Sequence, residues 1–168
     1  MATSAASWIP VYVGLGSNLD DPRAQVERAC QMLATLADTR FVSRSSLYRT
    51  PPFGPIAQPD FVNGVAALLT QIAPHELLAQ LKQIESTMGR VKPAERWGPR
   101  RIDLDLLVYG PQVIEEPEIT VPHPGIAERA FVLVPLADVA PDLYVSRLGR
   151  VATLLARVDS SNVVRLDG

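Results

Sequence analysis

The chain is poor in several features that define other classes of protein. A single cysteine, Cys30, among 168 residues excludes an intramolecular disulfide and a zinc site built from several cysteines. No apolar run approaches the ~18 residues that a membrane-spanning helix needs, so we expect no membrane partner. Residues 1–7 lack the basic and apolar segments of a secretory signal. This composition favours a reducing, cytoplasmic location.

The sequence also lacks a strong overall charge, with a formal net charge of −2. Residues 90–101 nevertheless hold five basic side chains and one acidic side chain, a local charge of +4, and the remaining residues sum to −6. Nucleic-acid-binding domains usually carry a basic patch that dominates their charge, so we expect no nucleic-acid partner. The charge pattern favours a local site for a small anion.

The hydrophobic content of 47% is typical of a globular protein. The length suits one domain over residues 1–168, within which residues 1–7 are expected to be disordered. Hydrophobic periodicity and turn residues predict four main strands, at residues 8–15, 39–49, 61–70 and 101–109. They predict two main helices, at residues 22–37 and 74–88, and Asp21 and Pro22 supply the start of the first.

Shorter elements follow: a hairpin within residues 112–120 and helices at residues 131–140, which include Pro135, and 151–158. The main order of strand, helix, strand, strand, helix, strand is the βαββαβ plan of a ferredoxin-like α+β sandwich. We therefore expect an antiparallel sheet with helices on one face and a C-terminal helical extension. The other face of the sheet is expected to be open.

Two acidic residues, Asp103 and Asp105, alternate with apolar residues along the last main strand. They share one face with Leu107 and Tyr109, and their Cβ atoms are expected roughly 7 Å apart. Two carboxylates this close repel each other, and a divalent cation removes that cost. The neighbouring arginines favour Mg²⁺ shared with a polyphosphate. Taken alone, the spacing fits a solvated acidic strand face equally well.

Three further segments bear on the site. The loop of residues 51–60 holds four prolines, and it and the basic loop of residues 90–100 are expected to act as lids rather than ordinary connections. His123, between two prolines, is either a fixed donor to a phosphate or a surface turn residue. The Gly14-Leu-Gly16 string matches no phosphate-loop pattern, so it predicts a tight turn into the first helix.

Several strings in the chain form a specific pattern. They are Gly16-Ser-Asn-Leu, Tyr48-Arg-Thr-Pro-Pro-Phe-Gly-Pro55, Asp60-Phe-Val-Asn63, Arg96-Trp-Gly-Pro-Arg100, Asp103-Leu-Asp105 and Val121-Pro-His123. Over about residues 11–141, the chain resembles the 6-hydroxymethyl-7,8-dihydropterin pyrophosphokinases of folate biosynthesis. The resemblance implies a ferredoxin-like sandwich that transfers pyrophosphate from MgATP to the hydroxymethyl group of the dihydropterin and releases AMP.

The same resemblance implies roles for individual residues. Asp103 and Asp105 would bind two Mg²⁺ ions, and Arg90 and Arg100 would be the catalytic residues that stabilise transition-state charge. Contacts to ATP would come from Leu78, Lys82, Glu85, Lys92, Arg96, Trp97, Leu106, Thr120, His123 and Arg129. The pterin would lie between Phe61 and Phe131, with Thr50, Pro51, Pro52, Phe53 and Asn63 around its edge.

Four residues depart from the family's pattern. Phe61 replaces a common tyrosine, Pro93 and Glu118 replace frequent basic residues, and Pro124 replaces a common aromatic residue. Phe61 keeps the stacking face and loses only a hydroxyl. The other departures bear on nucleotide affinity and on the motion of the lid, and they leave the expected reaction unchanged.

Two other functions remain open at this stage. A nucleotidyl or γ-phosphoryl transferase on the same scaffold would release pyrophosphate or ADP. An RNA-binding module is disfavoured because the strands lack RNP-like aromatic residues and the domain is not basic. We expect a monomer that acts on small molecules, because the pattern leaves no exposed apolar stripe.

Overall fold

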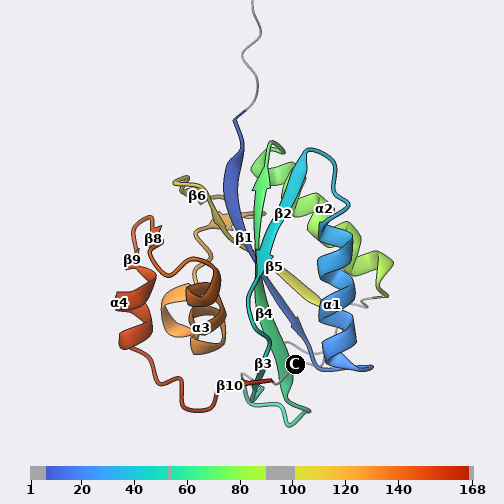
Figure 1. Cartoon of the computed structure of the whole chain (residues 1–168), viewed down its shortest axis with the longest axis vertical. Coiled ribbons are helices and arrows are strands. Elements are labelled where there is room, and N and C mark those ends of the chain that lie inside the picture. The colour runs from blue at the N-terminus through green and yellow to red at the C-terminus, as the bar shows by residue number, and fades with distance from the viewer. Residues whose placement is uncertain (1–6, 53, 90–100, 167–168) are drawn as a thin grey trace, which may run out of the picture.

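An antiparallel sheet forms the centre of the computed structural model, which describes residues 7–52, 54–89 and 101–166 (Figure 1). Its strands follow the order β10-β3-β4-β1-β5, and β2 pairs with β4 beside β3. The strands are β1 (Ile9–Ser17), β2 (Thr39–Arg44), β3 (Tyr48–Thr50), β4 (Phe61–Thr70), β5 (Asp103–Tyr109) and β10 (Val164–Arg165). Every pairing in this sheet is antiparallel, so the expected antiparallel sheet is confirmed.

Helices pack on both faces of the sheet (Figure 1). Helices α1 (Pro22–Leu33) and α2 (Pro74–Thr87) lie on one face, as expected. A short 3₁₀ turn, η1 (Ile126–Glu128), and the helices α3 (Ala130–Val139) and α4 (Val151–Ala156) lie on the other. The expectation of a fully open second face is therefore wrong. Helix α3 is apolar along nearly its whole length, so it has to be buried, and the sheet supplies the surface.

Two separate hydrophobic cores follow from this arrangement. The first joins α1 and α2 to the sheet and includes the fully buried Leu33, Leu77 and Leu81. The second joins α3 and α4 to the sheet around Leu133 and Leu136. The site lies on the second face, where α3 leaves part of the sheet uncovered.

The first helix begins as the sequence predicts. The Asp21 side chain accepts a hydrogen bond from the backbone N–H of Ala24 at 3.4 Å, and Pro22 is the first helical residue. The helix ends at Leu33, four residues before the predicted end, and residues 34–37 form a turn instead. The predicted strand at residues 39–49 divides into β2 and β3, because residues 45–47 leave the strand conformation.

The C-terminal third of the chain contains two small hairpins. Strands β6 (Ile114–Glu115) and β7 (Thr120–Val121) form the predicted hairpin, displaced by about one residue from its expected limits. Strands β8 (Tyr144–Val145) and β9 (Gly149–Arg150) form a second hairpin, which the sequence analysis missed. Helix α3 includes Pro135, as predicted. Among the described residues, no helix is both long enough and apolar enough to cross a bilayer.

Strand β5 does not alternate regularly along its length. Its register with β1 shifts between Tyr12 and Val13, where one residue of β5 has no partner opposite. Before the shift Leu104 and Leu106 face the first core, and after it Val108 joins Leu107 in the second core. Tyr109 then returns to the first core, where its hydroxyl donates to the Ile72 carbonyl at 2.5 Å. The prediction that Tyr109 shares the face of Asp103 and Asp105 is therefore wrong.

Candidate functional site

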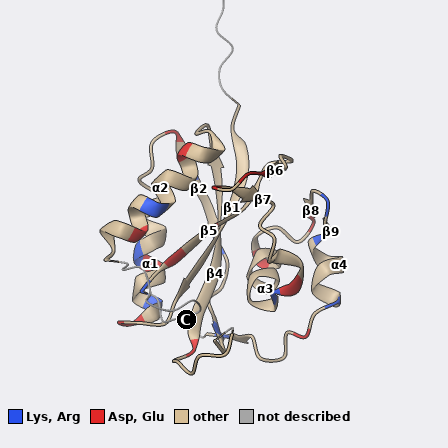
Figure 2. Cartoon of the chain, turned by 180° about the vertical axis from the view of Figure 1, so that it is seen from behind, with Lys and Arg blue, Asp and Glu red and all other residues tan. Residues whose placement is uncertain are grey.

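Two pockets meet at three residues on the second face of the sheet. Asp103 and Asp105 of β5, together with His123 of the turn after β7, line both pockets. Figure 2 shows the colour of acidic residues on β5, and the neighbouring strands β1 and β4 contain no charged residue. A ligand in either pocket would therefore lie against the same acidic wall.

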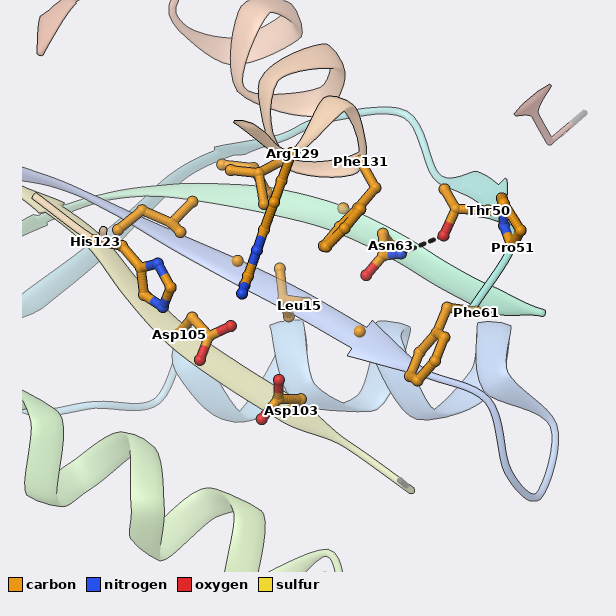
Figure 3. Close-up of a pocket in the computed structure, with 16 residues that line it drawn as sticks. Leu15, Thr50, Pro51, Phe61, Asn63, Asp103, Asp105, His123, Arg129 and Phe131 are labelled. Atoms are coloured by element: carbon orange, nitrogen blue, oxygen red, sulfur yellow. Dashed lines mark hydrogen bonds between the residues drawn. The ribbon is translucent and has the colours of Figure 1, made fainter. Parts of the chain in front are cut away.

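The first pocket lies between the sheet and the N-terminal end of α3, and its cavity volume is ≈ 260 Å³. Phe61 and Asn63 come from β4, Thr50 ends β3, and Phe131 comes from the first turn of α3 (Figure 3). The two phenylalanine rings border a space that contains the Asn63 side chain, whose amide nitrogen donates to the Thr50 hydroxyl at 2.6 Å. Aromatic faces with one amide group between them suit a flat heterocycle.

The second pocket lies between α2 and the β6–β7 hairpin, and its cavity volume is ≈ 400 Å³. Leu78, Lys82 and Glu85 line it from successive turns of α2, because their spacing places them on one face of the helix. Leu106 and Thr120 line it from β5 and β7. It combines apolar side chains with one lysine and several acidic residues, among them the two that both pockets share.

Glu85 has a structural contact as well as a place in this pocket. Its side chain is buried, and its Oε2 accepts the backbone N–H of Leu104 at 2.8 Å. Leu104 lies between Asp103 and Asp105, so this hydrogen bond ties α2 to the backbone that carries both acids. Glu85 thus sets the position of β5 relative to α2.

Replacing Glu85 by alanine should lower the free energy of unfolding by about 1–3 kcal/mol, because the buried Leu104 N–H loses its acceptor. Glu85→Gln should retain most of the stability, since its amide oxygen can still accept. Urea unfolding followed by circular dichroism would measure both variants. Equal stabilities for the alanine and glutamine variants would contradict the assignment.

His123 is held by two hydrogen bonds. Its backbone N–H donates to the Leu107 carbonyl at 2.8 Å, and its Nδ1 accepts the backbone N–H of Gly125 at 3.0 Å. Because Nδ1 accepts, the neutral ring carries its proton on Nε2. Burial lowers the pKa of His123, the positive charge of Arg129 lowers it further, and the negative charge of Asp103 opposes both. His123 is thus a neutral donor at physiological pH.

This shift predicts a pH dependence of stability. The folded-state pKa lies below the ordinary value of about 6.5, so the unfolded chain takes up the proton first as the pH falls. The resulting stability is present above about pH 6.5 and is lost as the pH falls towards the folded-state value. In EDTA, the wild-type Tm should drop more between about pH 7.5 and about pH 5 than the Tm of His123→Gln. Parallel profiles for the two proteins would count against the shift.

The structure brings together most of the described residues that the sequence analysis selected. Arg129 and Pro51 also line the first pocket, and the Arg129 guanidinium carbon lies 5.8 Å from the Phe131 ring centroid. Pro52 is described and lines neither pocket. Six selected residues lie outside the described part of the chain: Phe53, Arg90, Lys92, Arg96, Trp97 and Arg100.

Strand β1 contributes a part of the first pocket that was not predicted from the sequence. Gly14, Leu15 and Gly16 line the first pocket, and β1 continues through them to Ser17. The prediction of a tight turn at the two glycines is therefore wrong. A glycine inside a strand often marks a close approach of another group, and that signal could have identified this part of the site.

Asp103 and Asp105 fit a magnesium ion that is also bound by a ligand. Among the described residues, no group of three or more His, Cys, Asp or Glu side chains could hold a metal by itself. Mg²⁺ commonly takes only one or two carboxylates and completes its shell with phosphate oxygens and water. Two carboxylates at the junction of two pockets provide the hard oxygen donors for such an ion.

Comparison with known proteins identifies the class of enzyme to which this fold and site belong. A family model matches residues 12–141, which include every described residue of the two pockets. The chain is a transferase of the pyrophosphokinase class. It belongs to the family described as 7,8-dihydro-6-hydroxymethylpterin-pyrophosphokinase (HPPK).

Curated relatives support the same assignment. The chain is 49% identical over 158 residues to the 2-amino-4-hydroxy-6-hydroxymethyldihydropteridine pyrophosphokinase of Pseudomonas aeruginosa. The alignment covers 94% of this chain and 97% of the relative. It is 38% identical to the protein of the same name from Haemophilus influenzae, with 95% of this chain and 99% of the relative covered. The role of this chain is accordingly that of a pyrophosphokinase in folate biosynthesis.

Solved structures support the fold alone. The wild-type HPPK-DHPS protein of Plasmodium falciparum, crystallised with pteroate, aligns with a TM-score of 0.71 at 14% sequence identity. The alignment covers 93% of this chain and 43% of the longer one, so this chain spans less than half of that protein. The mixed α/β architecture with an antiparallel sheet is thereby confirmed.

Proposed function

We propose that the protein transfers pyrophosphate from MgATP to the hydroxymethyl group of 6-hydroxymethyl-7,8-dihydropterin and releases AMP. The first pocket binds the pterin and the second binds the nucleotide. The observation that supports this most strongly is that Asp103, Asp105 and His123 line both pockets. A phosphate chain that starts in the second pocket would therefore reach the ligand of the first pocket beside the acidic pair.

In the first pocket, Phe61 and Phe131 stack on the two faces of the pterin, and Thr50, Pro51 and Asn63 contact its edge. In the second pocket, Leu78 and Leu106 contact the nucleotide base. Lys82, Glu85 and Thr120 bind its polar groups.

The reaction joins the hydroxymethyl oxygen to the β-phosphorus and breaks the bond between that phosphorus and the oxygen that remains on AMP. Positioning and charge neutralisation provide most of the catalysis in such transfers. Asp103 and Asp105 would hold two Mg²⁺ ions, which neutralise phosphate charge when bound. His123 donates from Nε2 and Arg129 supplies positive charge beside it. One of the two aspartates accepts the hydroxyl proton.

The remaining proposed roles fall mostly on residues outside the described part of the chain. Arg90 and Arg100 stabilise the charge of the transition state, and Lys92, Arg96 and Trp97 contact ATP. Phe53 completes the surroundings of the pterin, and a contact from Pro52, which lines neither pocket, is also predicted. These roles stay predictions.

The strand order β5-β1-β4, followed by β2 and β3, supports a ferredoxin-like core within a single domain of residues 1–168. The protein works as a cytoplasmic monomer on small molecules, without nucleic-acid or membrane partners.

Incubation with 6-hydroxymethyl-7,8-dihydropterin, ATP and Mg²⁺, followed by chromatography of the nucleotides, tests the proposal. AMP should form only when the pterin is present and should disappear when EDTA removes the metal. Release of ADP would indicate γ-phosphoryl transfer, and release of pyrophosphate would indicate nucleotidyl transfer. Either product would overturn the proposed reaction.

A further inference from the structure

Gly16 lies directly opposite Asn63 in the sheet. The two residues are Cα partners in the antiparallel pairing of β1 with β4, and both line the first pocket. Cross-strand partners project to the same face, where their side chains would normally lie in contact. Because Gly16 has no side chain, the space above its Cα is available to its partner.

The Asn63 carboxamide occupies that space. A Cβ atom added to Gly16 would lie 2.6 Å from Asn63 Oδ1, well inside van der Waals contact, and 3.9 Å from Phe61 Cδ1. The other end of the carboxamide is fixed too, because Nδ2 donates to Thr50 Oγ1 at 2.6 Å. Figure 3 shows the oxygen on the side away from Thr50, between the rings of Phe61 and Phe131.

The backbone gives no other reason for a glycine at this position. Gly16 lies inside β1, and the glycines with a positive φ angle in the described part of the chain are Gly54, Gly89, Gly110 and Gly149. Alanine could adopt the same backbone conformation, and glycine weakens a strand interior relative to alanine. The glycine therefore provides room and not conformational freedom.

We infer that Gly16 is a positioning residue that determines the polarity of the pterin pocket. With Nδ2 held by Thr50 and Oδ1 over Gly16, Asn63 presents an acceptor to the ligand. The bound edge of the heterocycle must then carry an N–H donor at this point. A side chain at position 16 would displace the oxygen and reduce affinity for the heterocycle, while the fold would remain. This inference rests on the proposed use of the first pocket for the pterin.

Four variants test the inference: Gly16→Ala, Ser43→Thr, Asn63→Ala and the double variant Gly16→Ala/Asn63→Ala. Ser43→Thr is the control, because it adds one methyl group to a strand of the same sheet, at a half-buried residue of β2 that lines neither pocket. The probe is 6-hydroxymethylpterin, titrated by fluorescence in the presence of Mg²⁺ and α,β-methylene-ATP. The Tm and the affinity for the ATP analogue are measured alongside.

Gly16→Ala should raise the Kd for the pterin about tenfold or more, as expected for the loss of a ligand hydrogen bond. Its Tm and its affinity for the ATP analogue should match wild type, and Ser43→Thr should change the pterin Kd by less than about twofold. In the Asn63→Ala background, Gly16→Ala should have little further effect, because the group it displaces is gone.

Two results would overturn the inference alone: equal pterin affinities for Gly16→Ala and Ser43→Thr, or an undiminished effect of Gly16→Ala in the Asn63→Ala background. Failure of the proposed function has a different signature. Wild-type protein that does not bind the pterin, or an Asn63→Ala variant that binds it as well as wild type, would overturn the pocket assignment and the role of Gly16 with it.

Discussion

Replacing Asp105 by asparagine is expected to reduce kcat/KM about 10³-fold, and Asp103→Asn should have a similar effect. Each change removes a negatively charged oxygen donor from the wall that both pockets share. Metal ions that neutralise transferring phosphate contribute several kcal/mol to transition-state stabilisation, which corresponds to a loss of this size. Steady-state kinetics at saturating Mg²⁺, with detection of AMP, would measure the effect.

These substitutions should not destabilise the fold. Each substitution keeps the size of the side chain on a partly exposed strand position, so the packing of β5 is preserved. In EDTA, the Tm of each variant should lie close to that of wild type. Asp142→Asn, at an exposed residue outside both pockets, is the matched control and should retain full activity. Variants at 103 or 105 that keep activity within tenfold of wild type would contradict the metal site.

Asn63→Ala should raise the Kd for the pterin about 10²-fold and leave the affinity for the nucleotide nearly unchanged. Asn63 places its amide between Phe61 and Phe131, where its loss would leave a polar edge of the ligand facing apolar side chains. A site that hydrogen-bonds its ligand loses affinity steeply when one partner is missing. Titration with 6-hydroxymethylpterin, with and without the ATP analogue, would measure both affinities.

The most direct control for Asn63→Ala is Asn63→Asp. It keeps the size of the side chain and an acceptor oxygen, and it loses the N–H that bonds to Thr50. Its affinity for the pterin should lie between those of wild type and Asn63→Ala. A nucleotide affinity that falls in parallel with the pterin affinity would indicate general damage to the fold instead.

Much of the fold could be predicted from local patterns. Asp21 and Pro22 define the start of α1, and the spacing of Leu77, Leu81 and Ile84 defines the buried face of α2. Period-two alternation places Asp103 and Asp105 on the face opposite Leu104 and Leu106. These features depend on neighbours in sequence, which is why they are accessible without a structure.

What could not be predicted depends on contacts between distant segments. Nothing near Gly16 indicates that Asn63 folds over it, because the contact exists only through the pairing of β1 with β4. The hydrogen bond from the Leu104 N–H to Glu85 likewise requires the docking of α2 on β5. The family resemblance implies that Asn63 and Glu85 contact a ligand. The structure adds the approach of the Asn63 oxygen to Gly16 and the hydrogen bond from the Leu104 N–H to Glu85.

The register shift in β5 has a consequence for how the protein tolerates insertions and deletions. One unpaired residue separates the half of the strand that carries Asp103 and Asp105 from the half that anchors Val108 and Tyr109. Deletion of the unpaired Leu107 would make Leu106 and Val108 neighbours opposite Val13 and Tyr12, and both acids and Tyr109 would keep their present faces. Deletion of Leu104 would instead turn one of the two acids towards the first core. The effect of a shorter β5 therefore depends on which residue is lost.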